Sequence, residues 1–286
     1  MEGVGGRGNR RPRLPGLSVL EGPRRKARMT DSRATLSSVY QAPDLYDLVL
    51  ESYDEDLEFW LDEARRGRGP VLDVACGTGR VLLSLLERGI DADGLDREAP
   101  MLERLRVKAR DRGLKVEVTE ADMRDFTMPR RYARVFLPFN GFAHCDTTDD
   151  QLRCLKCCRE HVEPGGSLVL AMSFPACAYW ANPGTRVLEL EVAHPETGFP
   201  VRMYDTRAMD HVAQRQHSLT EIEELDGTGQ VLRVHRFEMT QRWVYRFELE
   251  LLLRQAGFAR CEILGGFDRR PLERDTDTLL AFAWRD

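Results

Sequence analysis

The most informative stretch of this sequence is a run of apolar residues that leads directly into a Gly-x-Gly turn. Val71, Leu72 and Val74 precede the turn, and an amphipathic segment follows it. This order is typical of a buried parallel strand that ends in a tight turn and continues into a helix. Glycines let a ligand approach the backbone closely, and the first turn of a helix offers unpaired N–H groups. The stretch therefore predicts a ligand site over residues 75–80.

Two details narrow the choice of ligand. A dinucleotide fingerprint has a third small residue three positions after its second glycine, whereas the bulky Leu82 stands there. A phosphate-binding P-loop would need Gly-Lys-Ser or Gly-Lys-Thr, and the sequence contains neither. Asp96 ends the next apolar run, about twenty residues on, where an acid suits the two hydroxyls of a ribose. The pattern predicts a nucleoside ligand without a pyrophosphate.

Six segments of the chain resemble, in order and spacing, the class I S-adenosylmethionine-dependent methyltransferases, and in particular the branch that methylates nitrogen or oxygen atoms of small molecules. They are VLDVACGTGR (71–80), GLDREAPML (94–102), EADMRDF (120–126), FLPFNGFAH (136–144), VEPGGSLVL (162–170) and LLLRQAGF (251–258). The resemblance implies an α/β, Rossmann-like fold with a seven-stranded, mostly parallel sheet. It also implies S-adenosylmethionine as the cofactor.

In an open α/β sheet the ligand lies beyond the carboxyl ends of the strands, and the resemblance assigns contacts there. Asp96 would accept hydrogen bonds from both ribose hydroxyls, and Asp122 would accept one from the adenine amino group. Arg80 would meet the methionine carboxylate or would instead be a solvated helix residue, and Tyr46 would bind cofactor or pack as helix core. The expected cofactor-binding residues are Tyr40, Tyr46, Ala75, Cys76, Gly77, Thr78, Gly79, Arg80, Asp96, Arg97, Met101, Asp122, Met123, Leu137 and Asn140.

His144 is the best candidate for a base, because it follows the predicted strand 132–137 and lies next to the expected methyl group. The alternative is a histidine that only closes its loop by hydrogen bonding. Tyr40 is a second catalytic candidate. The residues expected to contact the acceptor are His144, Tyr204 and Trp243, although aromatic residues in a sheet are often core.

Alternating apolar segments predict a parallel sheet with right-handed crossovers. One or two helices are expected over residues 35–66. The other expected elements are strand 70–75, helix 80–88, strand 91–95, helix 98–111, strand 115–120, strand 132–137, helix 149–162 with Thr148 or Asp149 as its cap, strand 167–173, helix 246–256, and strands 259–265 and 278–284. The resemblance implies that the last two strands run against the rest.

Between residues 185 and 245 the apolar residues recur at every second position, and Asp226-Gly-Thr-Gly229 is a strong hairpin turn. We expect an antiparallel β meander inserted into the α/β unit, as an acceptor lid, a dimer contact, or both. The expected division is a disordered basic extension (1–33), N-terminal helices with the cofactor-binding core (34–184), the insertion (185–245) and the C-terminal part of the core (246–286). The extension is rich in Arg, Gly and Pro, and Met29 is a plausible natural start.

Composition limits the partners of the protein. The formal charge of −5 over 286 residues argues against a nucleic-acid partner. No apolar run approaches the roughly 20 residues that a membrane helix needs, and the sequence shows no signal-peptide pattern. We expect a cytoplasmic protein that acts on a small-molecule acceptor, with no nucleic-acid or membrane partner, and a homodimer is possible.

Seven cysteines lack a disulfide-rich spacing, which favours reduced thiols. Cys154, Cys157, Cys158 and His161 suggest a metal site, but at helical spacing they fit a buried helix face better, since free cysteine packs as a small hydrophobic residue. We expect no metal.

Three classes of function fit these observations: a small-molecule methyltransferase, an enzyme that uses the same cofactor for cyclisation or another alkyl transfer, and a cofactor-binding module without turnover. The sequence favours the first. It does not distinguish nitrogen, oxygen and carbon acceptors.

Overall fold

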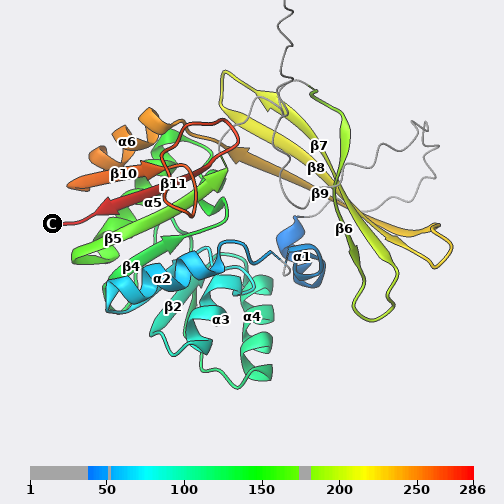
Figure 1. The fold of residues 1–286 in the computed structure, drawn as a ribbon, viewed down its shortest axis with the longest axis horizontal. Helices are drawn as coiled ribbons and strands as arrows, with labels where there is room; N and C mark the ends of the chain where they lie inside the picture. The colour runs from blue at the N-terminus through cyan, green and yellow to red at the C-terminus, as the bar shows by residue number, and fades with distance from the viewer. Residues whose placement is uncertain (1–37, 51–52, 174–181) are drawn as a thin grey trace, which may run out of the picture. The chain divides into compact units, whose positions relative to one another are not determined.

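A computed structural model of the chain describes residues 38–50, 53–173 and 182–286. Its larger sheet has seven strands in the order β10-β11-β5-β4-β1-β2-β3 (Figure 1). Their bounds are β1 Val71–Val74, β2 Ala92–Asp96, β3 Val118–Glu120, β4 Tyr132–Leu137, β5 Val162–Ser173, β10 Arg260–Leu264 and β11 Thr278–Trp284. The expected fold class, a mostly parallel Rossmann-like sheet, is confirmed. Only β11 runs against the other strands, because it pairs antiparallel with both β5 and β10, so the expectation of two such strands is wrong for β10.

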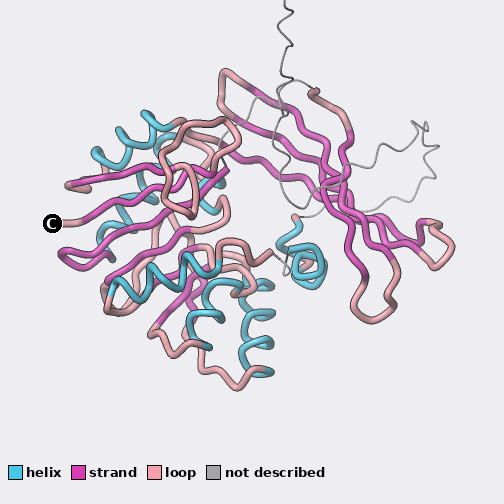
Figure 2. Tube along the Cα trace, in the orientation of Figure 1, coloured by secondary structure: helices cyan, strands magenta, loops and turns pink. Residues whose placement is uncertain are grey.

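Helices cover both faces of this sheet (Figure 2). They are α2 Leu57–Gly67, α3 Arg80–Glu87, α4 Ala99–Asp111, α5 Thr148–His161 and α6 Arg246–Gln255. Trp60 of α2, Leu82 of α3 and Leu105 of α4 are fully buried together against one face. The central strands β1 and β4 and the second half of β5 are mostly apolar and buried, as strands covered on both faces require, whereas the edge strands β3 and β10 carry exposed polar residues.

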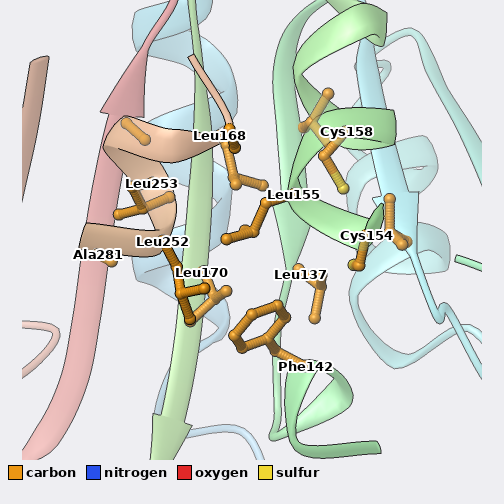
Figure 3. Close-up of a cluster of buried hydrophobic side chains, with 14 of the residues drawn as sticks. Leu137, Phe142, Cys154, Leu155, Cys158, Leu168, Leu170, Leu252, Leu253 and Ala281 are labelled. Atoms are coloured by element: carbon orange, nitrogen blue, oxygen red, sulfur yellow. The ribbon is translucent and has the colours of Figure 1, made fainter. Parts of the chain in front are cut away.

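The other face packs against α5 and α6. Leu155 of α5 and Leu252 and Leu253 of α6 meet Leu170 of β5 there (Figure 3). Cys154 and Cys158 are fully buried in the same cluster, which confirms their interpretation as core.

His161 also has a structural contact. Its Nε2 accepts a hydrogen bond from the backbone N–H of Met128 at 3.0 Å, and its ring stacks on Phe126.

A second sheet is formed by the inserted strands in the order β6-β7-β8-β9, all antiparallel. Their bounds are β6 Arg186–Ala193, β7 Pro200–Asp210, β8 Arg215–Leu225 and β9 Val231–Arg242. This meander agrees with the period-two pattern of the sequence, and we call it the inserted sheet. Val201, Ile222 and Phe237 on one of its faces pack around Val49 of helix α1 (Pro43–Leu50).

Arg242 joins the end of the inserted sheet to the α/β core. Its guanidinium is buried and donates hydrogen bonds to Gln151 of α5 and to Glu248 of α6, the latter at 2.8 Å. Arg215, at the start of β8, donates to the backbone oxygen of Asp146 at 3.0 Å. The inserted sheet is therefore anchored to α5, to α6 and to the backbone just before α5.

Most element ends agree with the expectations to within a few residues. The clearest differences surround α5, whose cap is Thr147, with its side chain accepting from the N–H of Asp150. β5 starts at Val162, immediately after α5, because Val162 already pairs with Tyr132. The predicted extension over residues 1–33 lies outside the described residues. Among the residues that are described, no helix is both long enough and apolar enough to cross a membrane.

Candidate active site

A cavity of about 860 Å³, including the space at its mouth, lies where β1, β2 and β4 end. Its walls also include Tyr40 from the short 3-10 helix η1 (Val39–Gln41) and Tyr46 from α1. Eleven of the residues predicted from the sequence line it: Tyr40, Tyr46, Ala75, Cys76, Gly77, Arg80, Asp96, Arg97, Met101, Met123 and His144. The sequence pattern thus leads to one site at the edge where an open α/β sheet binds its ligands.

The turn after β1 forms the floor of this cavity. Ala75, Gly77 and Gly79 all have positive φ angles, of 57°, 56° and 91°. Such angles are costly for alanine, so the surrounding structure holds Ala75 in a conformation that its side chain disfavours. A Cβ on Gly77 would lie 3.5 Å from the methyl carbon of Met101, inside the space that a ligand would use.

Asp96 is fixed by this same turn. Its two carboxylate oxygens accept hydrogen bonds from the N–H of Gly77 at 2.8 Å and from the N–H of Glu98 at 2.9 Å. Burial raises the pKa of Asp96, whereas the two N–H donors lower it. Each oxygen keeps a further lone pair, so the carboxylate can accept two more donors, as a ribose diol would supply.

Asp73 also lines the cavity, and the sequence interpretation did not include it. It is 1 % exposed, and neither of its carboxylate oxygens has a hydrogen-bond partner. Burial raises the pKa of Asp73 to about 7, although Arg80 and the nearby N–H of Leu82 oppose this, the latter without reaching hydrogen-bond geometry. A buried carboxylate without donors is costly unless a ligand supplies them.

Arg80 is the first residue of helix α3 and lines the cavity. It forms an ion pair with the buried Asp56 and donates to the backbone oxygen of Tyr53 at 3.2 Å. Its guanidinium carbon lies 5.1 Å from the ring centre of Tyr53 and 5.2 Å from that of Phe139. With 17 % of the side chain exposed, the alternative of a solvated helix residue is wrong. Contact with a cofactor carboxylate stays a prediction.

Tyr40 and His144 meet in the wall of the same cavity. The hydroxyl of Tyr40 lies 2.8 Å from Nε2 of His144 and 3.6 Å from Sδ of Met239 in β9. Burial lowers the pKa of His144 to about 4 and raises the pKa of Tyr40 well above its usual range. Both groups are therefore neutral near pH 7 and act as a hydrogen-bonding pair.

Tyr46 lies beside this pair, with its ring centre 6.0 Å from that of Tyr40. Burial raises the pKa of Tyr46 to about 12, so its hydroxyl also stays protonated. The side chain lines the cavity, which is the position that a cofactor role needs.

Several predicted residues lie just outside the cavity. Thr78 and Gly79 line a neighbouring cavity behind the turn, and Leu137 is fully buried beneath the loop. Asn140 bonds to Ser173, its Oδ1 accepting from the Ser173 N–H at 2.5 Å. Asp122 is held by Arg124 at 2.6 Å, which lowers the pKa of Asp122. None of these five residues lines the cofactor cavity, so the cofactor contacts predicted for them stay predictions.

Two predicted acceptor contacts lie elsewhere. Tyr204 in β7 stacks under Arg186, whose guanidinium carbon lies 3.3 Å from the ring centre. Trp243 is buried next to His211, with ring centres 6.4 Å apart. The structure does not bring either residue to the cavity.

The sequence interpretation also missed Glu98 and Phe139, which line the cavity. Glu98 follows Asp96 by two positions and accepts a hydrogen bond from Gln41 at 2.6 Å. Phe139 follows the end of β4 by two positions, and an aromatic residue in the loop after a strand is a signal that the sequence offers.

These residues fit S-adenosylmethionine. The glycine turn leaves space that a Cβ would narrow, and Asp73 and Asp96 are carboxylates that could accept from an amino group and a diol. Among the described residues, no cluster of three or more His, Cys, Asp or Glu side chains could hold a metal ion.

Comparison with known proteins agrees with this geometry. Residues 71–166 match a family described as a methyltransferase domain. The chain is 33 % identical over 144 residues to the cypemycin N-terminal methyltransferase of a Streptomyces species, covering 49 % of this chain and 58 % of that protein. It is 34 % identical over 100 residues to dTDP-3-amino-3,4,6-trideoxy-alpha-D-glucopyranose N,N-dimethyltransferase of Streptomyces venezuelae, covering 35 % and 40 %. The chain thus matches about half the length of these curated relatives.

The fold extends the likeness beyond this segment. A solved S-adenosylmethionine-dependent methyltransferase from Clostridium acetobutylicum superposes with a TM-score of 0.69 at 16 % identity, covering 86 % of this chain and 98 % of that one. At this identity the superposition shows the shared fold. Residues 71–166 thus match a methyltransferase domain, and the chain as a whole shares the fold of a solved S-adenosylmethionine-dependent methyltransferase.

Proposed function

We propose that this protein transfers a methyl group from S-adenosylmethionine to an amine nitrogen of a small molecule. The observation that carries the proposal is one cavity lined by two kinds of group. Asp73 and Asp96 lie beside the glycine turn, and the neutral pair of Tyr40 and His144 lines the same cavity. When bound, the cofactor supplies a methyl group activated by a sulfonium.

The chain's own residues would hold the cofactor through complementary donors and acceptors. We propose that Asp96 accepts the ribose hydroxyls, that Asp73 accepts the amino group of the methionine part, and that Met101 and Met123 flank the adenine. Asp73 gains most from such a contact because its oxygens have no partner in the protein.

Methyl transfer depends on orientation of the acceptor and on exclusion of water, and a base is needed only when the acceptor arrives protonated. With a pKa of about 4, His144 is a weak base for an ammonium. We infer that the pair of His144 and Tyr40 instead accepts a hydrogen bond from an N–H of the acceptor amine, which leaves the nitrogen lone pair free and directs it at the methyl group. The acceptor proton then passes to solvent.

The names of the relatives favour nitrogen over oxygen. One acts at the N-terminus of cypemycin, and the other is an N,N-dimethyltransferase of an amino sugar. The inserted sheet supports a role in closing the site, since Met239 of β9 contacts the Tyr40 hydroxyl.

Calorimetry with S-adenosylmethionine and S-adenosylhomocysteine tests the first half of the proposal. Mass spectrometry of a panel of amines, alcohols and thiols incubated with the protein and cofactor tests the second. We expect binding of both nucleosides and a mass gain of one methylene on amines only. Binding without any methylated product would indicate a module without turnover. A cyclised or alkylated product would indicate another reaction of the same cofactor, and absence of binding would refute the proposal.

A further inference from the structure

A second, open cavity of about 340 Å³, including the space at its mouth, lies beyond the carboxyl ends of β4 and β5, and it shares Phe139 with the cofactor cavity. Its other walls include Tyr53, Phe267, Asn140, Ser173 and Thr278. Phe139 is therefore the side chain that stands between the two spaces.

Phe139 is held in this position at a conformational cost. Its φ angle is 50°, which is rare for a bulky aromatic residue, and Asn140 follows with a φ of 63°. Such backbone strain persists only where the surroundings fix it, and it concentrates at functional sites. Two tethers fix it here: the side chain of Asn140 bonds to Ser173 at the end of β5, and the N–H of Asn140 donates to the oxygen of Ala171 at 3.2 Å.

The ring of Phe139 is also fixed from the other side. Its centre lies 5.4 Å from that of Tyr53, and the guanidinium of Arg80 lies over both rings. Asp56 in turn pairs with Arg80 and accepts from Nε1 of Trp60 at 2.8 Å. A 37 % exposed ring with these supports forms a fixed wall.

The lining of the second cavity indicates what it can hold. Three aromatic rings offer apolar faces, and Asn140, Ser173 and Thr278 offer neutral hydrogen-bonding groups. Among the described residues that line it, Asp56 is the one charged side chain, and Arg80 already neutralises it. The cavity therefore suits an uncharged group that has both an apolar face and hydroxyls, and it does not suit an anion or a cation.

We propose that Phe139 determines acceptor specificity: the uncharged, hydroxyl-bearing body of the acceptor lies in the second cavity, and its nitrogen reaches past Phe139 into the cofactor cavity. This inference rests on the proposed function, because it assumes an amine that meets the cofactor. It predicts that the ring limits the size of the groups already attached to the nitrogen.

The test uses binding to the full chain saturated with S-adenosylhomocysteine, measured by calorimetry or ligand-observed NMR. The probes are 4-aminocyclohexanol, cyclohexylamine, and the N-ethyl derivative of 4-aminocyclohexanol. Wild type should prefer the hydroxylated amine to cyclohexylamine and should reject the N-ethyl derivative. Thr278→Val removes one hydroxyl from the second cavity and should weaken the first preference by about tenfold.

With the protein saturated with S-adenosylhomocysteine, Phe139→Ala should raise the relative affinity for the N-ethyl derivative by about tenfold. Phe139→Leu keeps bulk without a ring and should raise the relative affinity for the N-ethyl derivative less. This variant covers the case in which the alanine variant does not fold. Phe247→Ala on the outer side of α6 is the matched control, since that ring is 72 % exposed, and it should change nothing.

Equal affinities for the hydroxylated and plain amines in wild type, or an unchanged N-ethyl preference in both folded Phe139 variants, overturns the inference. Methyl transfer is followed separately by release of S-adenosylhomocysteine. If the binding preferences change as expected but no amine is methylated, the second cavity is supported as a binding site for the amine and the proposed function is refuted.

Discussion

The hydroxyl oxygen of Tyr40 and Nε2 of His144 lie 2.8 Å apart, although 104 positions separate them in the sequence. Tyr40 comes from η1, and His144 ends the 3-10 helix η2 (Gly141–His144) that follows β4. Met239 brings the inserted sheet to the same hydroxyl. The N-terminal segment, the α/β core and the inserted sheet therefore meet at the hydroxyl of Tyr40.

The first prediction concerns the pH dependence of activity. Because burial lowers the pKa of His144 to about 4, this residue is already neutral at pH 6 and does not titrate during an ordinary assay. The acid limb of kcat/KM should therefore follow the acceptor amine and should be the same in His144→Gln. Removal of the hydrogen-bonding group in His144→Ala should lower kcat/KM by about a hundredfold. Initial rates between pH 5 and 9 measure both effects.

An acid limb near pH 6.5 that disappears in His144→Gln would show that His144 holds a proton in the reaction. Tyr40→Phe is the companion variant, since it keeps the ring between Tyr46 and His144 and removes only the hydroxyl. It should lower activity to a similar extent if the pair acts as a unit.

The same pKa shift has a consequence for stability. The unfolded chain takes up a proton at His144 below pH 6.5, whereas the folded chain resists it until about pH 4. Protonation therefore favours the unfolded state. The free energy of unfolding falls by up to about 3 kcal/mol as the pH falls from about 6.5 to about 4. Urea unfolding at pH 7 and pH 4.5 should show a smaller loss for His144→Gln than for wild type. Equal losses would place the acid sensitivity elsewhere.

Local patterns were sufficient to predict most of the fold. The mostly apolar strand Tyr132–Leu137 follows two arginines and leads into a Pro-Phe-Asn-Gly loop, and the structure has it at the predicted bounds. β5 differs because its start depends on a partner strand. Val162 pairs with Tyr132, and Ser167 pairs with Arg134, so the residues between them bulge out of register. A sequence pattern shows where a chain turns polar, but not which backbone groups find a partner.

The site was predictable where it depends on order along one strand and less so where it depends on packing. Asp96 ends a strand beside the glycine turn, and its position follows from the sheet. The position of Tyr204 depends on which face of the inserted sheet packs against the rest of the protein. Val201 and Met203 occupy the face that packs against α1, so Tyr204 lies on the other face. Alternation defines two faces, and only tertiary packing selects between them.

Asp73 gives the second prediction. Burial raises the pKa of Asp73 to about 7, so the ionised form is disfavoured in the fold. The unfolded chain ionises near pH 3.8, and the fold therefore loses stability as the pH rises from there through 7. Asp73→Asn removes this penalty and should stabilise the protein without ligand by on the order of 2–4 kcal/mol at pH 8. Denaturant unfolding at pH 8 measures the change.

The same variant should bind the cofactor more weakly, because an amide attracts an ammonium less than a carboxylate does. Calorimetry with S-adenosylhomocysteine should show this loss alongside the gain in stability. A variant that is both less stable and equally able to bind would show that Asp73 has a partner in the protein and no role in the ligand site.

Asp96 gives the third prediction. Its carboxylate accepts from Gly77 and Glu98 and, in the proposal, also from the ribose. Asp96→Asn retains one oxygen acceptor and replaces the other with a donor that faces an N–H, so the cofactor affinity should fall by about a hundredfold, the cost of leaving buried polar groups unpaired. Asp96→Ala should lose more and should also loosen the glycine turn. Affinity for S-adenosylhomocysteine that is unchanged in Asp96→Asn would refute the ribose assignment.

The anchor of the inserted sheet gives the fourth prediction. Arg242 is buried and donates to Gln151 and Glu248, and it lies three residues after Met239, which contacts Tyr40. Arg242→Met leaves a buried amide and a carboxylate without their cation, so the fold should lose about 3 kcal/mol. Denaturant unfolding measures this loss. Arg246→Met is the matched control, because Arg246 is a half-exposed arginine that pairs with Glu250 on the surface of α6 and should cost less than about 0.5 kcal/mol.

If the inserted sheet also positions the Tyr40 pair, kcat should fall in Arg242→Met at temperatures where the protein is still fully folded, while the affinity for S-adenosylhomocysteine is kept. The two readouts separate because Asp96 and the glycine turn lie in the α/β core, whereas Met239 moves with β9. A loss of stability with unchanged kcat would show that the anchor serves the fold alone and that the contact between Met239 and Tyr40 does not depend on it.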